Sequence, residues 1–251
     1  MVPTLHLVRH AEGFHNANKD RSIRDPKLTP LGEEQCAQFC REFAHHAKLT
    51  HLVASPLQRT VETCHGCFRQ AVEAGKRVIL LPELQETSDD PSGIGMDAAD
   101  LEREYGAGLV DASRVEPGWN DKRPHTRWAM DVAKIEARAR EARVLLRELA
   151  RGAGDDDAHL AVVSHGTFLL FLTEDYVALE GFGRPWKNAE VRSYRFLDLW
   201  GADGDASLGR VRVDHFATPA SAPLPEDRTS QHGPTRIDDG TGTGRDSTRE
   251  G

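Results

Sequence analysis

Four short segments of the chain are rich in leucine, valine and isoleucine. They are Thr4–His10, His51–Pro56, Arg77–Pro82 and His159–His165. Apolar runs of this length, without strict alternation of polar residues, are typical of strands that are buried on both faces. Each of the four segments is therefore predicted to be a strand of a parallel sheet.

Segments with helical periodicity lie between these strands. Thr29 is a candidate N-cap and Pro30 fits the first helical position, after which apolar residues recur at spacings of three and four. The apolar positions are Cys36, Phe39, Cys40, Phe43 and Ala47 in this helix, and Val132, Ile135, Ala139, Ala142, Leu146 and Leu149 in a second, longer one. Strands that alternate with helices indicate an α/β fold, so we expect a three-layer α/β/α sandwich with a mostly parallel central sheet.

Two later segments, Glu190–Leu199 and Gly209–Thr218, alternate apolar with polar residues. This alternation is typical of strands with one solvated face. We expect them to form a two-stranded antiparallel pair near the edge of the sheet.

The domain organisation follows from changes in composition. Residues 1–219 are predicted to form one domain. Within it, 87–128 is long and rich in glycine and aspartate, with a short helical pattern at 98–105, and is the candidate lid or specificity insertion. Residues 220–251 contain almost nothing apolar and are predicted to form a disordered tail.

The composition is that of an ordinary globular protein, with 251 residues of which 38% are hydrophobic and 29% charged. The formal net charge of -8 argues against a nucleic-acid partner, which needs a basic surface. No apolar run reaches the roughly 20 residues that cross a bilayer, and no secretory leader opens the chain. We therefore expect a cytoplasmic protein with no membrane partner.

The four cysteines are Cys36, Cys40, Cys64 and Cys67, and all fall in segments predicted to be helical. A disulfide framework is typical of small secreted domains, whereas a free cysteine in a larger domain is most often a buried thiol. We expect four reduced, packed thiols.

Cationic and imidazole side chains follow the predicted strands. His10 and His165 each end a strand, Arg9 directly precedes His10, and Arg59 follows the second strand closely. Ligands of open parallel sheets bind outside the carboxyl ends of the strands, so we expect these four residues at one edge. Arginine forks match phosphate oxygens, and the pattern predicts an anion site.

Four motifs in order resemble the histidine phosphatase superfamily, the branch with cofactor-dependent phosphoglycerate mutases and many small-molecule phosphatases. They are "LVRHAE", "LTPLGEEQC", "ASPLQRTVET" and "VVSHG". The resemblance runs from about Leu5 to Thr218, and "WKNAEVRSYRF" is similar to sequences of fungal members.

The resemblance implies a role for each matching residue. His10 matches the nucleophile that attacks phosphorus to form a phosphohistidine, while Arg9, Arg59 and His165 match groups that hold the phosphoryl oxygens. A neutral imidazole is abundant at pH 7, so it attacks without a metal. Asn16 matches a further phosphate contact. Thr167 and Ser164 flank the second histidine, either as phosphate contacts or as backbone caps.

The leaving oxygen needs a proton, and the family places a glutamate soon after the third strand. Glu86 matches that position better than Glu83, which directly follows the strand-ending Pro82. A positioned acid of this kind is worth about 10²- to 10⁴-fold in rate. Asp89 and Asp90 are expected to be solvated loop residues, unless one binds a polar part of the substrate.

Two positions depart from the family pattern. Ala11 stands where the family most often has glycine, and "SDDPSGIGMD" replaces the aromatic-glycine pattern associated with phosphoglycerate mutases. The resemblance thus implies a metal-independent phosphoric monoester hydrolase acting on a phosphorylated small molecule, with no cofactor. Mutase activity is the alternative. The aromatic and basic residues from Trp119 to Trp128 are expected to select the substrate.

Two readings from other classes stand beside this one. Zinc deaminases carry H-x-E and later P-C-x-x-C, and this chain has His10 and Glu12 with Cys64 and Cys67. The match is partial, because Thr63 replaces the proline and an arginine before the histidine opposes a bound cation. A catalytically silent phosphate-binding protein on the same fold is the other alternative.

Overall fold

The computed structural model describes residues 2–154, 157–202 and 204–216. A seven-stranded sheet with the order β4-β3-β2-β5-β1-β6-β7 forms its centre. The strands are β1 (Thr4–Arg9), β2 (Leu49–Ala54), β3 (Val78–Leu80), β4 (Val110–Asp111), β5 (His159–Ser164), β6 (Val191–Phe196) and β7 (Leu208–Val211). The first five are parallel to one another. Strand β6 runs antiparallel to β1, and β7 runs antiparallel to β6.

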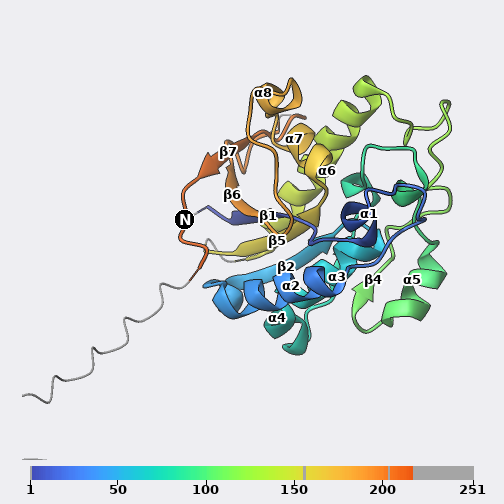
Figure 1. The fold of residues 1–251 in the computed structure, drawn as a ribbon. Helices are drawn as coiled ribbons and strands as arrows, with labels where there is room; N and C mark the ends of the chain where they lie inside the picture. Colours follow the sequence, from blue (N-terminus) through green and yellow to red (C-terminus); the bar gives the residue numbers. More distant parts are fainter. Residues whose placement is uncertain (1, 155–156, 203, 217–251) are drawn as a thin grey trace, which may run out of the picture. The chain divides into compact units, whose positions relative to one another are not determined.

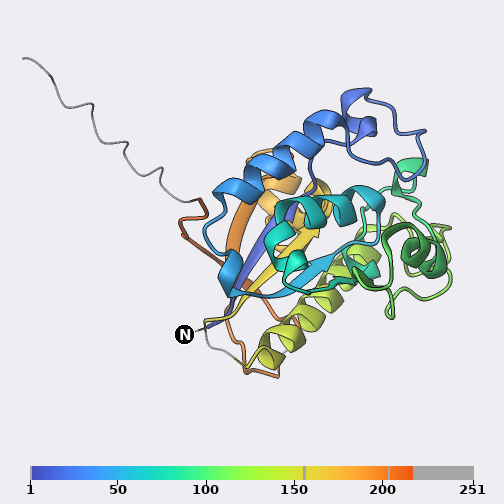
Figure 2. The same cartoon turned by 90° about the horizontal axis from the view of Figure 1, so that it is seen from below.

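Helices cover both faces of this sheet (Figure 1). The α-helices are α1 (Phe14–Ala17), α2 (Pro30–Glu42), α3 (Gln58–Cys67), α4 (Arg69–Glu73), α5 (Ala98–Tyr105), α6 (Val132–Gly152), α7 (Gly166–Leu172) and α8 (Tyr176–Leu179), and the 3-10 turns are η1 (His46–Lys48), η2 (Pro82–Leu84) and η3 (Pro91–Gly93). Helices α2, α3 and α4 lie on one face, and α6 and α7 lie on the other (Figures 1 and 2). The predicted three-layer α/β fold with a mostly parallel sheet is confirmed.

Two apolar cores lie on either side of the sheet. On β1, Leu5 and Leu7 pack into the core beneath α6 and α7, whereas Val8 packs into the core beneath α2 and α3. Strand β5 divides in the same way, with Val162 in one core and Val163 in the other. Because side chains alternate across a strand, a run that is apolar at both sets of positions must be covered on both faces.

The first predicted helix begins as expected but ends early. The Thr29 hydroxyl accepts a hydrogen bond from the Gly32 amide at 3.0 Å, which caps α2. The prediction carried the helix to Ala47, and this is wrong, since Phe43 is extended and forms an isolated bridge with Phe216. Burial of the Phe43 ring therefore outweighs one further helical turn.

All four cysteines are free, as predicted. Cys36, Cys64 and Cys67 are buried between α2 and α3, and Cys40 is half-buried. Burial raises the pKa of the Cys64 thiol, so this group packs as a small apolar residue.

The antiparallel pair exists but is shorter than predicted. Strand β6 pairs with β1 and with β7, which places the pair at one edge of the sheet. Strand β4, of only two residues, forms the other edge, so part of the 87–128 segment joins the sheet. The described residues before 217 form one compact unit. The predicted boundary near 219 and the tail 220–251 lie outside the described residues and stay predictions.

No helix within the described ranges combines the length and apolar character that crossing a membrane requires.

Histidines gather at the amino-terminal end of the sheet. His6 Nε2 lies 2.8 Å from His159 Nδ1, and His6 Nδ1 lies 2.8 Å from the Ser193 hydroxyl. That hydroxyl also lies 2.8 Å from His215 Nε2, and the His45 ring stacks on His6 with centroids 5.4 Å apart. A neutral His6 satisfies this chain by donating through one ring nitrogen and accepting through the other. Burial and the neighbouring His159 lower the pKa of His6 to about 2.

Acidification is expected to destabilise the fold through this cluster. A histidine whose pKa is lowered in the folded state binds its proton only on unfolding, so its stabilisation holds above pH 6.5 and is lost as the pH falls. Between pH 6.5 and pH 5 the free energy of unfolding should fall by about 2 kcal/mol for each fully neutral imidazole. Urea titrations of the wild type and His6→Asn at both pH values measure this change. The slope of the free energy of unfolding against pH gives the number of protons taken up on unfolding, and His6→Asn should take up about one fewer. An unchanged slope in His6→Asn, or an equal change in the exposed His125→Asn control, would contradict the assignment.

Candidate active site

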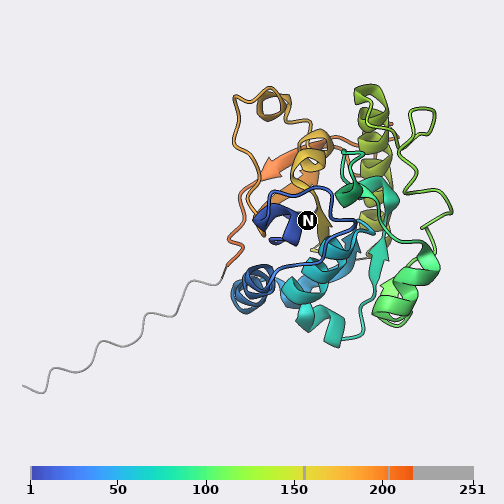
Figure 3. The ribbon, with the colours of Figure 1, turned by 45° about the vertical axis from the view of Figure 1, so that its right-hand side comes forward.

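The register of β1 and β5 brings the two predicted histidines together. Arg9 pairs with Ser164 in the parallel ladder, and the next amide, of His10, donates to the Ser164 carbonyl at 2.9 Å. His10 and His165 therefore leave adjacent strands at the same edge, with ring centroids 5.2 Å apart. This edge opens into a cavity of about 400 Å³. In the ribbon of Figure 3, α1 lies between α2 and α7.

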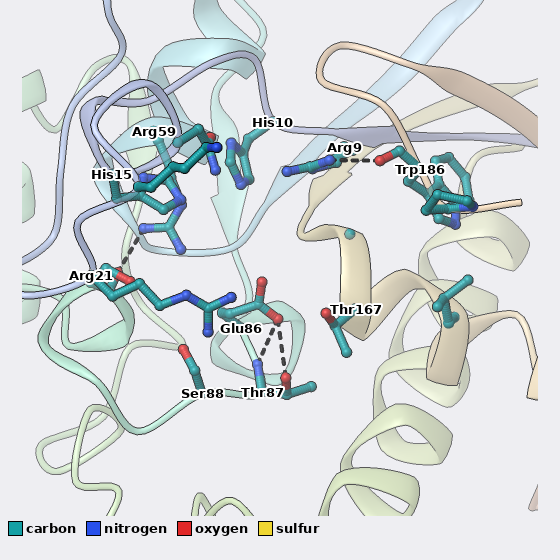
Figure 4. Close-up of a pocket in the computed structure, with 16 residues that line it drawn as sticks. Arg9, His10, His15, Arg21, Arg59, Glu86, Thr87, Ser88, Thr167 and Trp186 are labelled. Atoms are coloured by element: carbon teal, nitrogen blue, oxygen red, sulfur yellow. Dashed lines mark hydrogen bonds between the residues drawn. The ribbon is translucent and has the colours of Figure 1, made fainter. Parts of the chain in front are cut away.

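Most of the predicted site residues line this cavity (Figure 4). These are Arg9, His10, Asn16, Arg59, Glu86 and Thr167. The motif analysis assigned no role to several other lining residues, namely His15, Lys19, Arg21, Ser88, Ser92, Leu170, Pro185 and Trp186. Four lining side chains are Lys or Arg and only one is a carboxylate, so the cavity favours an anion.

His10 is held as a neutral imidazole with one free nitrogen. Its ring is only 2% exposed, and Nδ1 lies 2.7 Å from the Ala11 carbonyl. A carbonyl only accepts, so Nδ1 carries the proton and Nε2 carries the lone pair. Burial and the nearby Arg59 and Arg9 hold the pKa of His10 well below its usual value. At pH 7 this imidazole is therefore uncharged and presents the lone pair of Nε2.

Each of the two arginines is held by a hydrogen bond to a backbone carbonyl. Arg59 donates through Nη1 to the Ser92 carbonyl at 2.8 Å, and Arg9 donates through Nη1 to the Trp186 carbonyl at 2.6 Å. The Nε of each is buried without a partner. A Cβ at Gly166 would lie 3.2 Å from Arg9 Nε, so glycine lets this guanidinium lie against the start of α7. The remaining donors suit the oxygens of a bound anion.

His165 lies behind the cavity rather than in its wall. It is fully buried, its Nδ1 accepts from Arg59 Nη2 at 3.2 Å, and its Nε2 lies 3.0 Å from the Ser55 hydroxyl. Both ring nitrogens are thus occupied within the protein. The structure brings His165 to the site as a partner of Arg59, and its predicted contact with phosphate stays a prediction.

The smaller predicted contacts divide in the same way. Asn16 Oδ1 accepts from the Gly13 amide at 3.2 Å, and Thr167 faces the cavity at the start of α7. The Ser164 hydroxyl is buried and donates to the Leu84 carbonyl at 2.7 Å. Ser164 therefore supports the backbone, whereas Asn16 and Thr167 remain candidates for binding.

Glu86 and not Glu83 reaches the cavity. One Glu86 carboxyl oxygen accepts from the Thr87 amide at 2.8 Å, and Figure 4 shows the other on the side of His10. Glu83 does not line the cavity and lies 3.7 Å from Arg127 instead. The position of Glu86 fits a proton donor to the leaving oxygen.

Two buried cations hold the backbone that carries Glu86. Lys122 Nζ donates to the Glu86 carbonyl at 2.9 Å, and Arg138 Nη1 donates to the Gln85 carbonyl at 2.5 Å. Arg138 also stacks over the Phe168 ring at 4.4 Å. Burial and the neighbouring Arg138 lower the pKa of Lys122 to about 7. These contacts fix the loop, and hence the position of the Glu86 carboxyl group.

Comparison with known proteins shows the family of the chain. The sequence profile of the histidine phosphatase superfamily (branch 1) matches residues 5–197. The chain belongs to the histidine phosphatase superfamily.

Curated relatives of the chain carry phosphoglycerate mutase names. "Phosphoglycerate mutase-like protein 1" of Arabidopsis thaliana is 35% identical over 77 residues, which are 26% of this chain and 27% of the relative. "Probable phosphoglycerate mutase GpmB" of Enterobacter sp. (strain 638) is 34% identical over 116 residues, 46% of each chain. The chain thus matches about a quarter to a half of the length of these relatives.

A solved structure shares the fold. The ecdysone phosphate phosphatase of Bombix mori in complex with tungstate superposes with a TM-score of 0.55 at 16% identity, covering 90% of this chain and 98% of that one. At this identity the likeness is one of fold alone.

The described residues do not form the metal site that the zinc interpretation requires. Among the residues described by the structure, no three His, Cys, Asp or Glu side chains are grouped to hold a metal. Cys64 and Cys67 lie in the core between α2 and α3, whereas His10 faces the cavity.

Ala11, which replaces the usual family glycine, has a negative φ and is accommodated without strain.

The expected substrate wall is wrong for the two tryptophans. Neither Trp119 nor Trp128 lines the cavity, and Trp119 is 1% exposed, with its ring in the core and Nε1 donating to the Met96 carbonyl at 3.0 Å. The 87–128 segment reaches the cavity through Thr87, Ser88 and Ser92 instead. The prediction failed for Trp119 because its ring is buried within the 87–128 segment, and composition does not show which side chains are buried.

Trp119→Ala is expected to act on stability. Removing a fully buried tryptophan should lower the free energy of unfolding by about 3–5 kcal/mol. The order of preference among phosphate esters should stay unchanged, because the ring is outside the cavity. Denaturant unfolding together with a substrate panel tests this, with the exposed Trp200→Ala as control. A changed order of preference among phosphate esters, with unchanged free energy of unfolding, would instead show that Trp119 contacts the substrate.

Proposed function

We propose that this protein is a metal-independent phosphatase that hydrolyses a small-molecule phosphate ester through a phosphohistidine at His10. The observation that carries the proposal is the 2.7 Å contact of His10 Nδ1 with the Ala11 carbonyl, which leaves Nε2 as the free lone pair. Membership of the superfamily supports the reaction class.

The proposed reaction has two steps. His10 Nε2 attacks phosphorus, the ester P–O bond breaks, and Glu86 donates a proton to the leaving oxygen. Water then attacks the phosphohistidine, Glu86 takes a proton from that water, and the N–P bond breaks to release inorganic phosphate. Arg9 and Arg59 stabilise the charge on the phosphoryl oxygens in both transition states without having to reorganise.

Polar residues around the cavity favour hydrolysis over mutase chemistry. A mutase must keep water away while its intermediate reorients, whereas a phosphatase needs water at the phosphohistidine. Lys19, Arg21 and Ser88 line the cavity, and the first two are exposed. Hydrated side chains of this kind admit water, which supports the phosphatase assignment.

A phosphate-release screen over a panel of metabolite phosphates, run with and without EDTA, tests the proposal. Release that is insensitive to EDTA and absent in His10→Ala is expected. Interconversion of phosphoglycerates without release would favour a mutase. Loss of activity with EDTA would favour a metal enzyme, and phosphate binding without turnover would favour a silent member of the fold.

A further inference from the structure

His15 is a third imidazole in the cavity. It lies on α1, its ring centroid is 5.5 Å from that of His10, and it lines the same cavity. Figure 4 shows His15 beside Arg59, on the opposite side of His10 from Arg9. The proposed reaction so far gives this side chain no role.

Packing fixes which ring nitrogen of His15 faces the cavity. A Cβ at Gly13 would lie 3.0 Å from Nδ1 and 3.1 Å from Cε1, so this edge of the ring rests on the Gly13 backbone. Nδ1 is buried and has no hydrogen-bond partner. Nε2 has no partner among the residues that the structure describes and is not buried, so it is the nitrogen open to the cavity.

The same packing selects the tautomer. Burial and the nearby Arg59 and Arg9 lower the pKa of His15 to about 3, so the ring is neutral and carries one proton. An N–H buried without an acceptor is costly, whereas a proton on Nε2 reaches water or a ligand. His15 thus presents an Nε2–H donor to the cavity.

This donor adds to those of the arginines. Both nitrogens of His165 have partners within the protein, Arg59 and Ser55, whereas Nε2 of His15 has none among the described residues. His15 also lies beside Arg59, on the opposite side of His10 from Arg9. We propose that His15 Nε2–H donates a hydrogen bond to a phosphoryl oxygen held by Arg59, which makes His15 a further catalytic residue. This inference rests on the proposed function, because it assumes that a phosphoryl group occupies the cavity.

Two amide substitutions separate the donor from the ring. In His15→Gln the amide nitrogen reaches the place of Nε2, whereas in His15→Asn it reaches only the place of Nδ1. The affinity for inorganic phosphate, measured by calorimetry, should fall about 10- to 100-fold in His15→Asn, as for the loss of a hydrogen bond to a charged group. His15→Gln should stay within about 3-fold of the wild type, since it keeps a donor. The value of kcat/KM for phosphate esters should follow the same order.

His65→Asn is the matched control. His65 is also half-buried with an unpartnered Nε2, but it lies on α3 against Tyr105 and outside the cavity. Phosphate affinity should be unchanged in this variant. Unchanged affinity in His15→Asn, or equal losses in both His15 variants at wild-type melting temperature, would overturn the proposal. A wild type that binds phosphate but releases none would refute the phosphatase function alone, because the binding comparison still tests His15.

Discussion

Replacing His10 with alanine is expected to reduce turnover by about 10⁴-fold or more, because the attacking atom itself is lost. No other side chain of the cavity is placed to substitute. His165 has both nitrogens engaged, and Nδ1 of His15 is packed against Gly13 while its Nε2 carries the proton. The activity of His10→Ala should therefore fall to the background of the assay.

The covalent intermediate gives this prediction a second readout. When the protein is quenched during turnover of a ³²P-labelled phosphomonoester, label should remain attached in alkali and be lost in acid, as a phosphohistidine requires. His65→Ala should label like the wild type, because His65 lies outside the cavity. Label that persists in His10→Ala, or that resists acid, would identify a different nucleophile.

The convergence of the site is predictable because it follows from strand geometry. Continuous apolar runs indicate buried parallel strands, and parallel strands end at one edge of their sheet. Arg9 pairs with Ser164, so the residues that follow, His10 and His165, are neighbours despite their separation in the chain. The resemblance then adds chemical roles to positions that the fold had already brought together.

Burial in the loops is not predictable in the same way. Lys122 looks like a solvated charge in its segment, yet it lies against the backbone of Glu86, 36 residues earlier. Arg138 interrupts the apolar face of α6, where it is buried and stacks on Phe168, a partner on another helix. Such contacts depend on where loops dock, which helical periodicity does not encode.

The same limit explains the residues that were misplaced or missed. His15 and His165 have similar chemistry in the sequence, but packing leaves a cavity-facing N–H only on His15. Trp119 resembles a binding aromatic in composition, although its ring fills the core. Function at each position is decided by which atom remains unpartnered at the cavity, and this is a property of the folded chain.

Glu86→Gln is expected to show the second-largest effect, one that depends on the leaving group. For alkyl phosphates, whose alkoxide leaves poorly, loss of the proton donor should lower kcat/KM by about 10²- to 10⁴-fold. For nitrophenyl phosphate the loss should be much smaller, because nitrophenolate departs without protonation. Initial rates on both ester types measure the difference.

Glu83→Gln is the matched control for this experiment. Both glutamates lie on the same loop after β3, but Glu83 is outside the cavity beside Arg127, so its amide should leave both rates close to wild type. Charge also changes equally in the two variants, which excludes a general electrostatic effect as the cause of any difference. Equal losses on alkyl and nitrophenyl esters in Glu86→Gln would point to binding rather than proton transfer. A leaving-group dependence in Glu83→Gln instead would move the acid to that residue, and the loop would then have to shift during turnover to bring it to the cavity.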